Sequence, residues 1–483
     1  MFLGIDLGTS GVRLLLCDAD QNVVASAEAP CTVQHPHPGW AEQDPQSWVD
    51  ALCGAMSELR SSHGPALDAL QGIGLSGQMH GAVLLDRDGQ VLRPCILWND
   101  TRSHVEAATL DATPGVRNLS GNAVFPGFTA PKLAWVANQE PKVFAQVATV
   151  MLPKDYLVFW LTGRRVTDMS DAAGTSWLNT GARAWSDDLL VAGGMRRDQM
   201  PDLVEGSDVV ATVQPHIVEN LGLPANVPVV AGGADNASAA CGVGALKAGQ
   251  GFVSLGTSGV LLAARDDYGA DPATAVHSFC HAVPGRWYQM GVILAATDSL
   301  NWLSKVVGAA PDVLTAELGD RVIGPGPIRF APYLSGERTP HNDAAIRGGF
   351  SGLDISHGRA EMTQAVLEGV SFALRDCQAA LQATGTRLDQ CLAIGGGSQS
   401  RYWVELLATV LNQPLDLPAD GEFGAALGAV RLAICGVTET DPEQVMTRPK
   451  IAETIAPRAD LTAAYADAYQ KWRATYPSLK ALP

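Results

Sequence analysis

The sequence has no excess of basic residues. Lysine and arginine number 33 against 50 aspartates and glutamates, which gives a net charge of −17 at pH 7. Nucleic-acid backbones and anionic membrane surfaces attract proteins with clustered positive charge. The chain is therefore expected to bind neither. A small anionic ligand remains compatible with this charge, because it needs only a few backbone N–H groups and one cation.

Paired cysteines, long apolar runs and a secretory signal are also missing. The nine cysteines are scattered and never form Cys-x-x-Cys, so reduced thiols fit better than a disulfide framework. No stretch approaches the about 18 uninterrupted apolar residues that indicate a membrane-spanning helix. The first residues, Met1–Asp6, lack a basic segment and already include an acid. These absences predict a cytoplasmic enzyme.

Glycine, by contrast, is abundant, and one glycine-rich turn occurs twice. The chain has 50 glycines in 483 residues, more than the average share of about 7%. The letters of Leu7–Val12 recur as Leu255–Val260, about half a chain length later. A fainter echo links Gly233–Ala245 with Gly421–Ala429. Two such echoes predict a duplicated fold.

The repeated turn and its surroundings also predict the fold class. Each copy stands between two short apolar runs and so predicts a β-hairpin. Because 483 residues exceed one compact core, we expect an N-terminal domain over 1–245 and a C-terminal domain over 246–483, with a helical tail after about 441. Strand and helix patterns mix in both halves, which predicts an α/β fold. Strands are expected over Gly72–Leu75, Ala82–Leu85 and Val91–Trp98, and helices over Gln46–Arg60, Lys132–Gln139, Lys154–Leu161, Glu361–Leu381, Ser400–Leu411 and Leu461–Trp472.

The first copy of the turn places a carboxylate beside many hydrogen-bond donors. Asp6 ends an apolar run, and residues 8–10 follow it with N–H and hydroxyl groups. Such a turn can hold the oxygens of a polyphosphate while the acid holds Mg²⁺, usually through water. A plain hairpin turn, with Asp6 capping stray amides, is the alternative. The second copy, Gly256–Ser258, favours phosphate, because two such turns can hold one triphosphate from both sides.

Asp235 follows directly after another apolar run. It comes after Val227–Val230 and stands among the small residues of Ala231–Ala237. Small residues permit close approach of a ligand and tight packing of the helix that begins here. A carboxylate in this place can accept a proton or hold a polar substrate. An N-cap role is the alternative, and the two roles are compatible.

Three further segments offer polar groups or bare backbone. Gly395–Trp403 joins an apolar strand to a helix through three glycines, where a flat or anionic ligand can approach, although plain turns contain such triplets too. Gln78–Gly81 is a turn between two strands, and its His80 can bond a sugar hydroxyl. Trp98 and the polar residues after it can form another wall. For His80 and Trp98, an ordinary packed or surface residue is the alternative.

Together these segments resemble the FGGY family of carbohydrate kinases. The resemblance runs from Ile5 to about Cys435 and includes both turns, Asp235 and, further, Thr129–Trp135, Glu368–Ala373 and Gly395–Gly397. Within that family, several segments are similar to the kinases of D-xylulose, namely His35–Pro45, Gln78–Gly81, Ile96–Asp100, Leu152–Tyr156, Asp168–Thr175 and Pro332–Pro340. The resemblance implies two duplicated actin-like (ribonuclease-H-like) ATPase domains with a deep cleft between them. The sugar is then expected on the N-terminal side and the nucleotide mostly on the C-terminal side.

The resemblance also implies roles for individual residues. Asp235 becomes the base that takes the proton from the attacking hydroxyl, Asp6 becomes the acid near Mg²⁺ and the phosphates, and both are candidate metal ligands. Ala234 stands where related kinases often carry glycine, a small departure. The expected sugar contacts are Gln78, Met79, His80, Trp98, Asp235 and Asn236. The expected ATP contacts are Gly8, Thr9, Ser10, Gly256, Thr257, Asn301, Gly396, Gly397 and Arg401.

The implied activity is the ATP- and Mg²⁺-dependent phosphorylation of D-xylulose to D-xylulose 5-phosphate. A kinase for another ketose or polyol, such as ribulose or glycerol, is the alternative within the family. A non-kinase actin-like ATPase or binding module is the alternative on the same fold, because fold alone does not fix function. The expected partners are the sugar and ATP, and a homodimer is left open.

Overall fold

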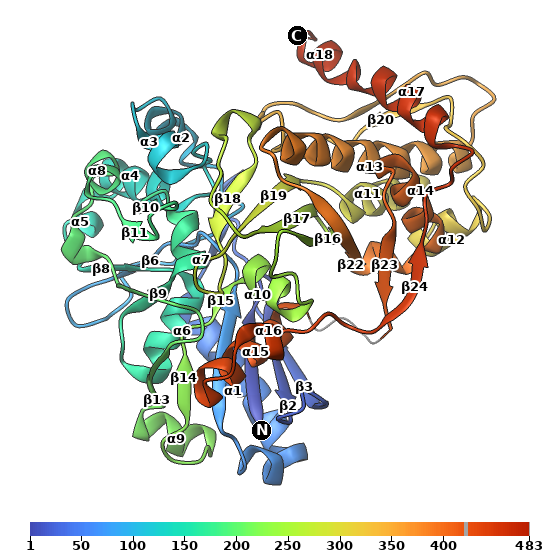
Figure 1. Cartoon of the computed structure of the whole chain (residues 1–483). Helices are drawn as coiled ribbons and strands as arrows, with labels where there is room; N and C mark the ends of the chain where they lie inside the picture. Colours follow the sequence, from blue (N-terminus) through green and yellow to red (C-terminus); the bar gives the residue numbers. More distant parts are fainter. Residues whose placement is uncertain (420–423, 483) are drawn as a thin grey trace.

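The chain forms two lobes in a computed structural model that describes residues 1–419 and 424–482 (Figure 1). Each lobe contains one seven-stranded sheet. The first sheet has the order β13-β14-β5-β1-β2-β3, with β15 also paired to β5. Its strands are β1 (Phe2–Leu7), β2 (Gly11–Cys17), β3 (Val23–Pro30), β5 (Gly72–Gly77), β13 (Val209–Thr212), β14 (Pro228–Val230) and β15 (Gly233–Ala234).

The second sheet repeats the topology of the first. Its order is β18-β19-β17-β16-β22-β23-β24. In each sheet an antiparallel hairpin carries the repeated turn, two parallel strands follow on one side, and an antiparallel strand closes that edge. The predicted duplication and the predicted hairpins are confirmed. The strands are β16 (Gly249–Leu255), β17 (Gly259–Arg265), β18 (His277–Cys280), β19 (Trp287–Ile293), β22 (Leu388–Ile394), β23 (Leu415–Pro418) and β24 (Ile451–Ile455).

The expected long helices are all present. In the first of them, Asp44 caps the helix by accepting from Gln46 N, Pro45 occupies its first turn, and a buried face with Trp48 and Leu52 packs on the first sheet. The structure extends four of these predictions, shortens α14 by one residue and shifts α17 by one: α1 (Pro45–Leu67), α4 (Thr129–Gln139), α6 (Pro153–Thr162), α13 (Arg359–Ala383), α14 (Arg401–Leu411) and α17 (Thr462–Arg473).

Shorter elements connect these parts. The additional helices are α2 (His104–Asp111), α3 (Val116–Ser120), α5 (Pro141–Phe144), α7 (Met169–Ala172), α8 (Asp187–Ala192), α9 (Pro215–Leu221), α10 (Asp235–Gly242), α11 (Thr297–Val307), α12 (Pro311–Ala316), α15 (Gly424–Thr438), α16 (Pro442–Val445) and α18 (Thr475–Lys480). The additional strands are β4 (Glu42–Gln43), β6 (Val83–Leu85), β7 (Cys95–Ile96), β8 (Thr149–Met151), β9 (Val166–Asp168), β10 (Leu178–Asn179), β11 (Ala184–Trp185), β12 (Asp202–Val204), β20 (Arg329–Ala331) and β21 (Gly349–Ser351).

The strand expected over Val91–Trp98 is mostly absent. Only Cys95–Ile96 form a strand, and they pair with β4 rather than with β6. Pro94 interrupts the run, because proline has no N–H to donate to a ladder. Leu85 still bridges Val91 across the expected turn, but the ladder of β6 is with β8.

Helix α15 belongs to the second half of the sequence but packs against the first sheet. It contacts β1, β5 and α10. Two glycines permit this packing: a Cβ added at Gly74 would lie 1.9 Å from the carbonyl oxygen of Ala429, and one added at Gly428 would lie 1.8 Å from that of Ser238. The two echoing segments therefore end up side by side as α10 and α15. Residues 421–423 of the second echo lie outside the described residues.

The tail after residue 441 begins with α16, which packs on α15 beside the first sheet, and continues into β24, α17 and α18 of the second lobe. In α17 the hydroxyl of Tyr469 donates to Asp376 Oδ1 over 2.5 Å, and the Trp472 indole donates to the carbonyl of Phe330 over 2.7 Å. The tail thus covers α13, as Figure 1 shows. Over the part of the chain that is described, none of the helices combines the length and the apolar character needed to cross a bilayer.

Candidate active site

The topology of the first sheet places Asp6 and Asp235 on either side of one strand end. Asp6 on β1 lies opposite Ser76 of β5, and Gly233 of β15 lies opposite Ser76 from the other side. Asp235 begins α10 directly after β15. The two carboxyl groups, 229 residues apart by the difference 235 − 6, thereby become neighbours, and the charge of Asp6 contributes to raising the pKa of Asp235.

Asp235 is suited to accept a proton near neutral pH. Burial, and secondarily the charge of Asp6, raises its pKa to about 7. Its Oδ1 accepts from the N–H of Asn236 over 2.6 Å and from Asn236 Nδ2 over 2.9 Å. Among the described residues nothing donates to Oδ2, so this oxygen faces the site without a partner. The N-cap position of α10 belongs to Ala234, which leaves the carboxyl of Asp235 available for chemistry.

Asp6 borders a groove beside the first repeated turn. The groove has a volume of about 400 Å³, and its lining includes Asp6, Gly8, Ser10 and Arg13. Burial raises the pKa of Asp6, and Arg13, its cross-strand neighbour on β2, acts in the opposite direction. A carboxylate, backbone N–H groups and a hydroxyl therefore line one concave surface, which suits an oxyanion with its divalent cation.

His80 presents one ring nitrogen as an acceptor. Its Nδ1 lies 2.8 Å from the carbonyl oxygen of Gly174, which can only accept, so Nδ1 carries the proton. Burial, and secondarily the charge of Lys132, lowers its pKa to about 3, so the ring is neutral. The ring stacks on Phe128 at 4.6 Å. Nε2 is therefore left to accept a hydrogen bond, for example from a sugar hydroxyl. The preceding Met79 is buried, with its sulfur 4.0 Å from the Tyr288 hydroxyl.

Thr9 joins the phosphate turn to the predicted sugar wall. Its hydroxyl donates to Gln78 Oε1 over 3.0 Å and accepts from the Trp98 indole over 3.0 Å. Gln78 is buried, and its Nε2 donates to Gln43 Oε1. These bonds hold the turn, the Gln78 strand end and Trp98 in one rigid unit. Thr9, Gln78 and Trp98 are thus brought together, as the sequence predicts for one site.

The second repeated turn meets the three-glycine segment. The N–H of Thr297, the first residue of α11, donates to the carbonyl of Gly256 over 3.0 Å, and that of Ala296 donates to the carbonyl of Thr257 over 2.8 Å. Gly397 packs on the strand end at Leu255, where an added Cβ would approach to 2.7 Å. Gly396 is exposed, with open space where a Cβ would be. This cluster offers bare backbone to a ligand.

Two of the expected nucleotide contacts lie further out. Asn301 is exposed on α11, one turn beyond Thr297. Arg401 is exposed at the start of α14 and pairs with Glu453 over 2.6 Å. Both lie on elements that begin at the glycine cluster, while their side chains are directed to the surface of the lobe.

The sequence alone assigned no role to a buried network of polar side chains that lies behind Asp235. The Lys154 ammonium lies 3.0 Å from Asp168 and donates to the carbonyl of Ala231 over 3.2 Å. Asp168 in turn accepts from the Ser170 hydroxyl over 2.5 Å, and that hydroxyl accepts from the N–H of Ala234 over 3.0 Å. These polar groups therefore hold both ends of the Gly232–Gly233 segment that leads to Asp235.

Three carboxyl groups surround this lysine. Asp155, Asp168 and Asp171 each bring an oxygen within 4.8 Å of the others, all fully buried. Lys154 occupies their midst and lies 2.5 Å from Asp155. Within the described part of the chain both oxygens of Asp171 lack hydrogen-bond partners, and burial raises its pKa well above the usual range, which favours the neutral acid. The signal in the sequence was the pair of charged residues inside the apolar stretch 152–161.

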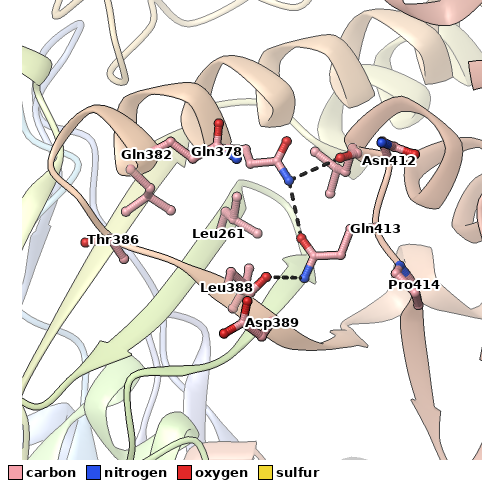
Figure 2. A pocket seen from close by; sticks show the side chains of 11 residues that line it. Leu261, Gln378, Gln382, Thr386, Leu388, Asp389, Asn412, Gln413 and Pro414 are labelled. Atoms are coloured by element: carbon pink, nitrogen blue, oxygen red, sulfur yellow. Dashed lines mark hydrogen bonds between the residues drawn. The ribbon is translucent and has the colours of Figure 1, made fainter. Parts of the chain in front are cut away.

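Another groove, of about 390 Å³, lies elsewhere. Figure 2 shows it at the start of β22, lined by amide side chains that bind one another and the backbone: Gln378 donates to Gln413, and Gln413 donates to the carbonyl of Leu388. The predicted nucleotide glycines follow the opposite end of β22. This groove contains none of the predicted site residues.

Comparisons with known proteins agree with this geometry. The N-terminal domain of the FGGY family of carbohydrate kinases matches residues 1–242, and its C-terminal domain matches residues 251–437. The xylulose kinase of Escherichia coli (strain K12) is 45% identical over 482 residues, with 99% of each chain covered.

Solved structures give the same result. A kinase from Brucella ovis, named a xyloylose kinase, is 55% identical, with a TM-score of 0.96 and coverage of 100% of this chain and 99% of that one. The xylulose kinase of Rhodospirillum rubrum is 31% identical, with a TM-score of 0.90 and coverage of 99% and 98%. The expected fold, two actin-like ATPase domains, is confirmed. The chain belongs to the FGGY family of carbohydrate kinases.

Proposed function

We propose that the chain transfers the γ-phosphoryl group of ATP to the 5-hydroxyl of D-xylulose, giving D-xylulose 5-phosphate and ADP. The observation that carries the chemistry is the pair of neighbouring carboxyls, Asp6 and Asp235, at the end of β5. The choice of sugar is supported by the xylulose kinases of Escherichia coli and Rhodospirillum rubrum, which match over nearly the whole chain. ATP is the phosphoryl donor of the family.

Asp235 acts as the general base in this proposal. The hydroxyl oxygen forms a bond to the γ-phosphorus, the bond from that phosphorus to the β–γ bridging oxygen breaks, and ADP leaves with the electron pair. The proton of the hydroxyl goes to Asp235, whose Oδ2 is free and whose pKa is about 7. Most of the rate then comes from alignment and charge stabilisation, because phosphoryl transfer leaves the protein little covalent work.

The other expected residues have roles that fit their positions. His80 Nε2 accepts from a sugar hydroxyl, Met79, Trp98 and Asn236 form the adjoining wall, and Gln78 fixes the turn. We assign this sugar side to residues 1–245. The nucleotide side, over 246–483, has the Gly256–Thr257 turn and the glycines at 396 and 397, with Asn301 and Arg401 at its border.

A divalent cation fits the acidic side of the site. Asp6, which lines the groove beside the turn, and its neighbour Asp235 offer hard oxygen atoms of the kind that would hold Mg²⁺. Bound there, Mg²⁺ neutralises charge on the phosphates. Asp6 holds the acidic side of this arrangement, while Gly8, Thr9 and Ser10 provide the donors. A homodimer is compatible with the proposal and is not required by it.

A coupled kinase assay over a sugar panel tests the proposed substrate. D-xylulose, L-ribulose, D-ribulose, xylitol and glycerol are compared at equal ATP and Mg²⁺. We expect D-xylulose to give the highest kcat/KM. Equal or faster phosphorylation of ribulose or glycerol would reject the substrate, and ATP turnover that no sugar stimulates would reject the kinase.

A further inference from the structure

Arg338 extends from a firmly held loop of the second lobe. The loop joins β20 to β21, and both neighbours of Arg338 bind the end of β19. Glu337 accepts from the N–H of Leu294 over 3.1 Å. Thr339 donates its N–H to the carbonyl of Val292 over 3.0 Å, and its hydroxyl accepts from the Val292 N–H over 3.1 Å. The second sheet therefore fixes the backbone from which Arg338 starts.

The guanidinium of Arg338 reaches the first lobe. Its Cζ lies 5.1 Å from the ring centroid of Phe125. A Cβ added at Gly127 would lie 3.6 Å from Nη2 of Arg338 and 2.3 Å from the carbonyl oxygen of Trp98. The carbonyl of Gly127 accepts from Lys132, which also donates to the carbonyl of His80. Arg338 thus lies where Trp98 and the His80 turn meet, in the wall that we assign to the sugar.

This guanidinium is without a partner. Within residues 1–419 and 424–482 it makes no hydrogen bond and no ion pair, although its side chain is only partly exposed. Burial lowers its pKa to about 10, so it stays protonated at neutral pH. A guanidinium has five N–H donors and no acceptor, and its contact with the Phe125 ring leaves those donors without hydrogen-bond acceptors.

The charge of the adjacent Glu337 favours the charged guanidinium, but burial raises the pKa of Glu337 to about 8, and among the described residues no ion pair joins the two. Lys132 is a cation whose ammonium binds backbone carbonyls. His277 from β18 is fully buried among Phe125, Phe128 and Phe279, with both ring nitrogens unpaired. Its pKa, like that of His80, is lowered by burial and further by the charge of Arg338. The guanidinium is therefore left with unused N–H donors beside Lys132 and the neutral rings of His80 and His277, and it suits an electron-rich ligand.

We propose that Arg338 binds the carbonyl end of the sugar, so that the second lobe takes part directly in recognising it. The inference rests on the proposed function. In D-xylulose the hydroxyl that reacts and the carbonyl stand near opposite ends of a five-carbon chain. The reacting end belongs at Asp235, beside Asp6, and Arg338 lies beside His80 instead. A carbonyl oxygen only accepts hydrogen bonds and a guanidinium only donates them, so the two are complementary.

Recognition of this kind ties the sugar to both lobes. Asp235 and His80 hold it from the first lobe, and Arg338 holds it from the second. The sugar then completes the contact between the lobes, and its carbonyl distinguishes a ketose from the corresponding polyol. Arg338 is accordingly a residue that determines specificity, and it takes no part in the proton transfer.

The experiment compares steady-state kinetics and direct sugar binding in three proteins. Arg338→Met removes the donors and keeps the length of the side chain, and Arg338→Lys keeps the charge without the planar set of donors. Arg375→Met is the matched control, because Arg375 also stacks on an aromatic ring, Tyr469 at 4.5 Å, in the same lobe but against the tail. D-xylulose and xylitol serve as acceptors, and titration calorimetry without ATP gives the Kd for D-xylulose.

We expect Arg338→Met to raise the KM and Kd for D-xylulose about 10- to 100-fold, the range for a lost hydrogen bond to a charged group. The KM for ATP should change less than twofold, and the preference for D-xylulose over xylitol should fall at least fivefold. The KM and Kd of Arg338→Lys for D-xylulose should lie between those of the wild type and those of Arg338→Met. The KM and Kd of Arg375→Met should resemble those of the wild type. If Arg338→Met fails to fold, Arg338→Lys serves as the test. A rise of at least threefold in its KM for D-xylulose then supports the inference, and a smaller rise overturns it.

Several outcomes would overturn the inference. The inference fails if folded Arg338→Met has a sugar KM within twofold of the wild type or an unchanged preference for D-xylulose over xylitol. It also fails if Arg375→Met shows the same rise in sugar KM as Arg338→Met. Failure of the proposed function is recognised separately, because wild-type protein would then not phosphorylate D-xylulose. In that case the ketose that the wild type phosphorylates best replaces D-xylulose, and a protein with no ketose activity overturns the inference as well.

Discussion

Asp235 and Asp6 show how one residue's environment sets its chemistry. Both are buried carboxyls, and they flank the same strand end, so each disfavours the charge of the other. Arg13 opposes this effect at Asp6, whereas Asp235 has only its neighbour Asn236 to stabilise the charge. Burial raises the pKa of both carboxyls, and Asp235, whose pKa is about 7, therefore holds its proton up to about that pH.

The pH profile of the enzyme should follow Asp235. Its pKa of about 7 lies above the ordinary value, so the proton is bound more tightly in the folded protein and the ionised base is lost as pH falls below 7. We expect kcat/KM for the sugar to fall about tenfold per pH unit below that value and to be level above it. A rate measurement from pH 5 to 9 checks this, and a flat profile down to pH 5 would contradict it.

The variant Asp235→Asn tests the base directly. The amide retains the shape of the side chain and loses the ability to take a proton. We expect kcat to fall by about 10²- to 10⁴-fold with little change in sugar KM. Thermal unfolding serves as the control for folding. A variant that melts normally and keeps its kcat would remove Asp235 from this role.

The residues that the sequence could predict are those whose context is local. Asp6 directly precedes a turn that recurs letter for letter, and Asp235 stands at a strand-to-helix junction, so pattern alone made both candidates. The roles proposed for Arg338 and Lys154 follow only from tertiary contacts. Arg338 contacts Phe125 and Lys154 binds Ala231, and in both pairs the partner is far away in the sequence. No periodicity or spacing reports such contacts.

At the scale of elements, the junction between β15 and α10 is held from behind. Lys154 on α6 fixes the carbonyl of Ala231, and Ser170 on α7 fixes the N–H of Ala234. Neither side chain approaches the site itself. They are positioning residues, because they act through the backbone that carries Asp235.

Removal of the Ser170 hydroxyl should misplace the base without unfolding the lobe. In Ser170→Ala the buried N–H of Ala234 loses its acceptor, which costs about 1–3 kcal/mol. We expect kcat to fall about tenfold while the KM for the sugar changes less than twofold, and Ser170→Thr should restore most of the loss. Kinetics with thermal unfolding provides the readout.

A matched buried serine provides the control. The Ser371 hydroxyl donates only to the carbonyl of Leu367 inside α13, in the other lobe. Ser371→Ala should therefore lower stability slightly and leave kcat unchanged. Equal losses of kcat in both variants would show that the effect of Ser170 is not specific to its junction.

The long helices and the two hairpins were predicted, whereas most of the short elements and much of the strand pairing were not. Long helices such as α13 and α14 show a clear apolar period, and the hairpins follow from the repeated turn. The pairing of β6 with β8 depends on residues 64 or more positions apart, by the difference 149 − 85, and Pro94 prevented the local alternative. Patterns along the chain do not encode which distant strand becomes the partner.

At the scale of the whole molecule, the two lobes share one hydrophobic cluster. It joins Phe2 and Met79 of the first half to Leu262 and Tyr288 of the second, and it includes Val430 of α15. Cooperative unfolding is expected wherever one core must be disrupted at once.

We therefore expect a single calorimetric transition despite the two lobes. The calorimetric and van't Hoff enthalpies should agree within about 20% in the ligand-free protein, which is the usual test of two-state behaviour. Differential scanning calorimetry measures both. Two resolved transitions, or a calorimetric enthalpy near twice the van't Hoff value, would show that the lobes unfold independently.

The position of α15 also orders events during synthesis. The first sheet keeps an uncovered apolar face until residues 424–438 have left the ribosome, because that helix covers β1 and β5. A nascent chain that has just completed its first 245 residues thus cannot reach its final state. It must wait, shielded by chaperones or by transient contacts, for a segment made almost 200 residues later (424 − 245 = 179). Termination between residue 246 and the end of α15 would leave the first lobe, too, unfinished.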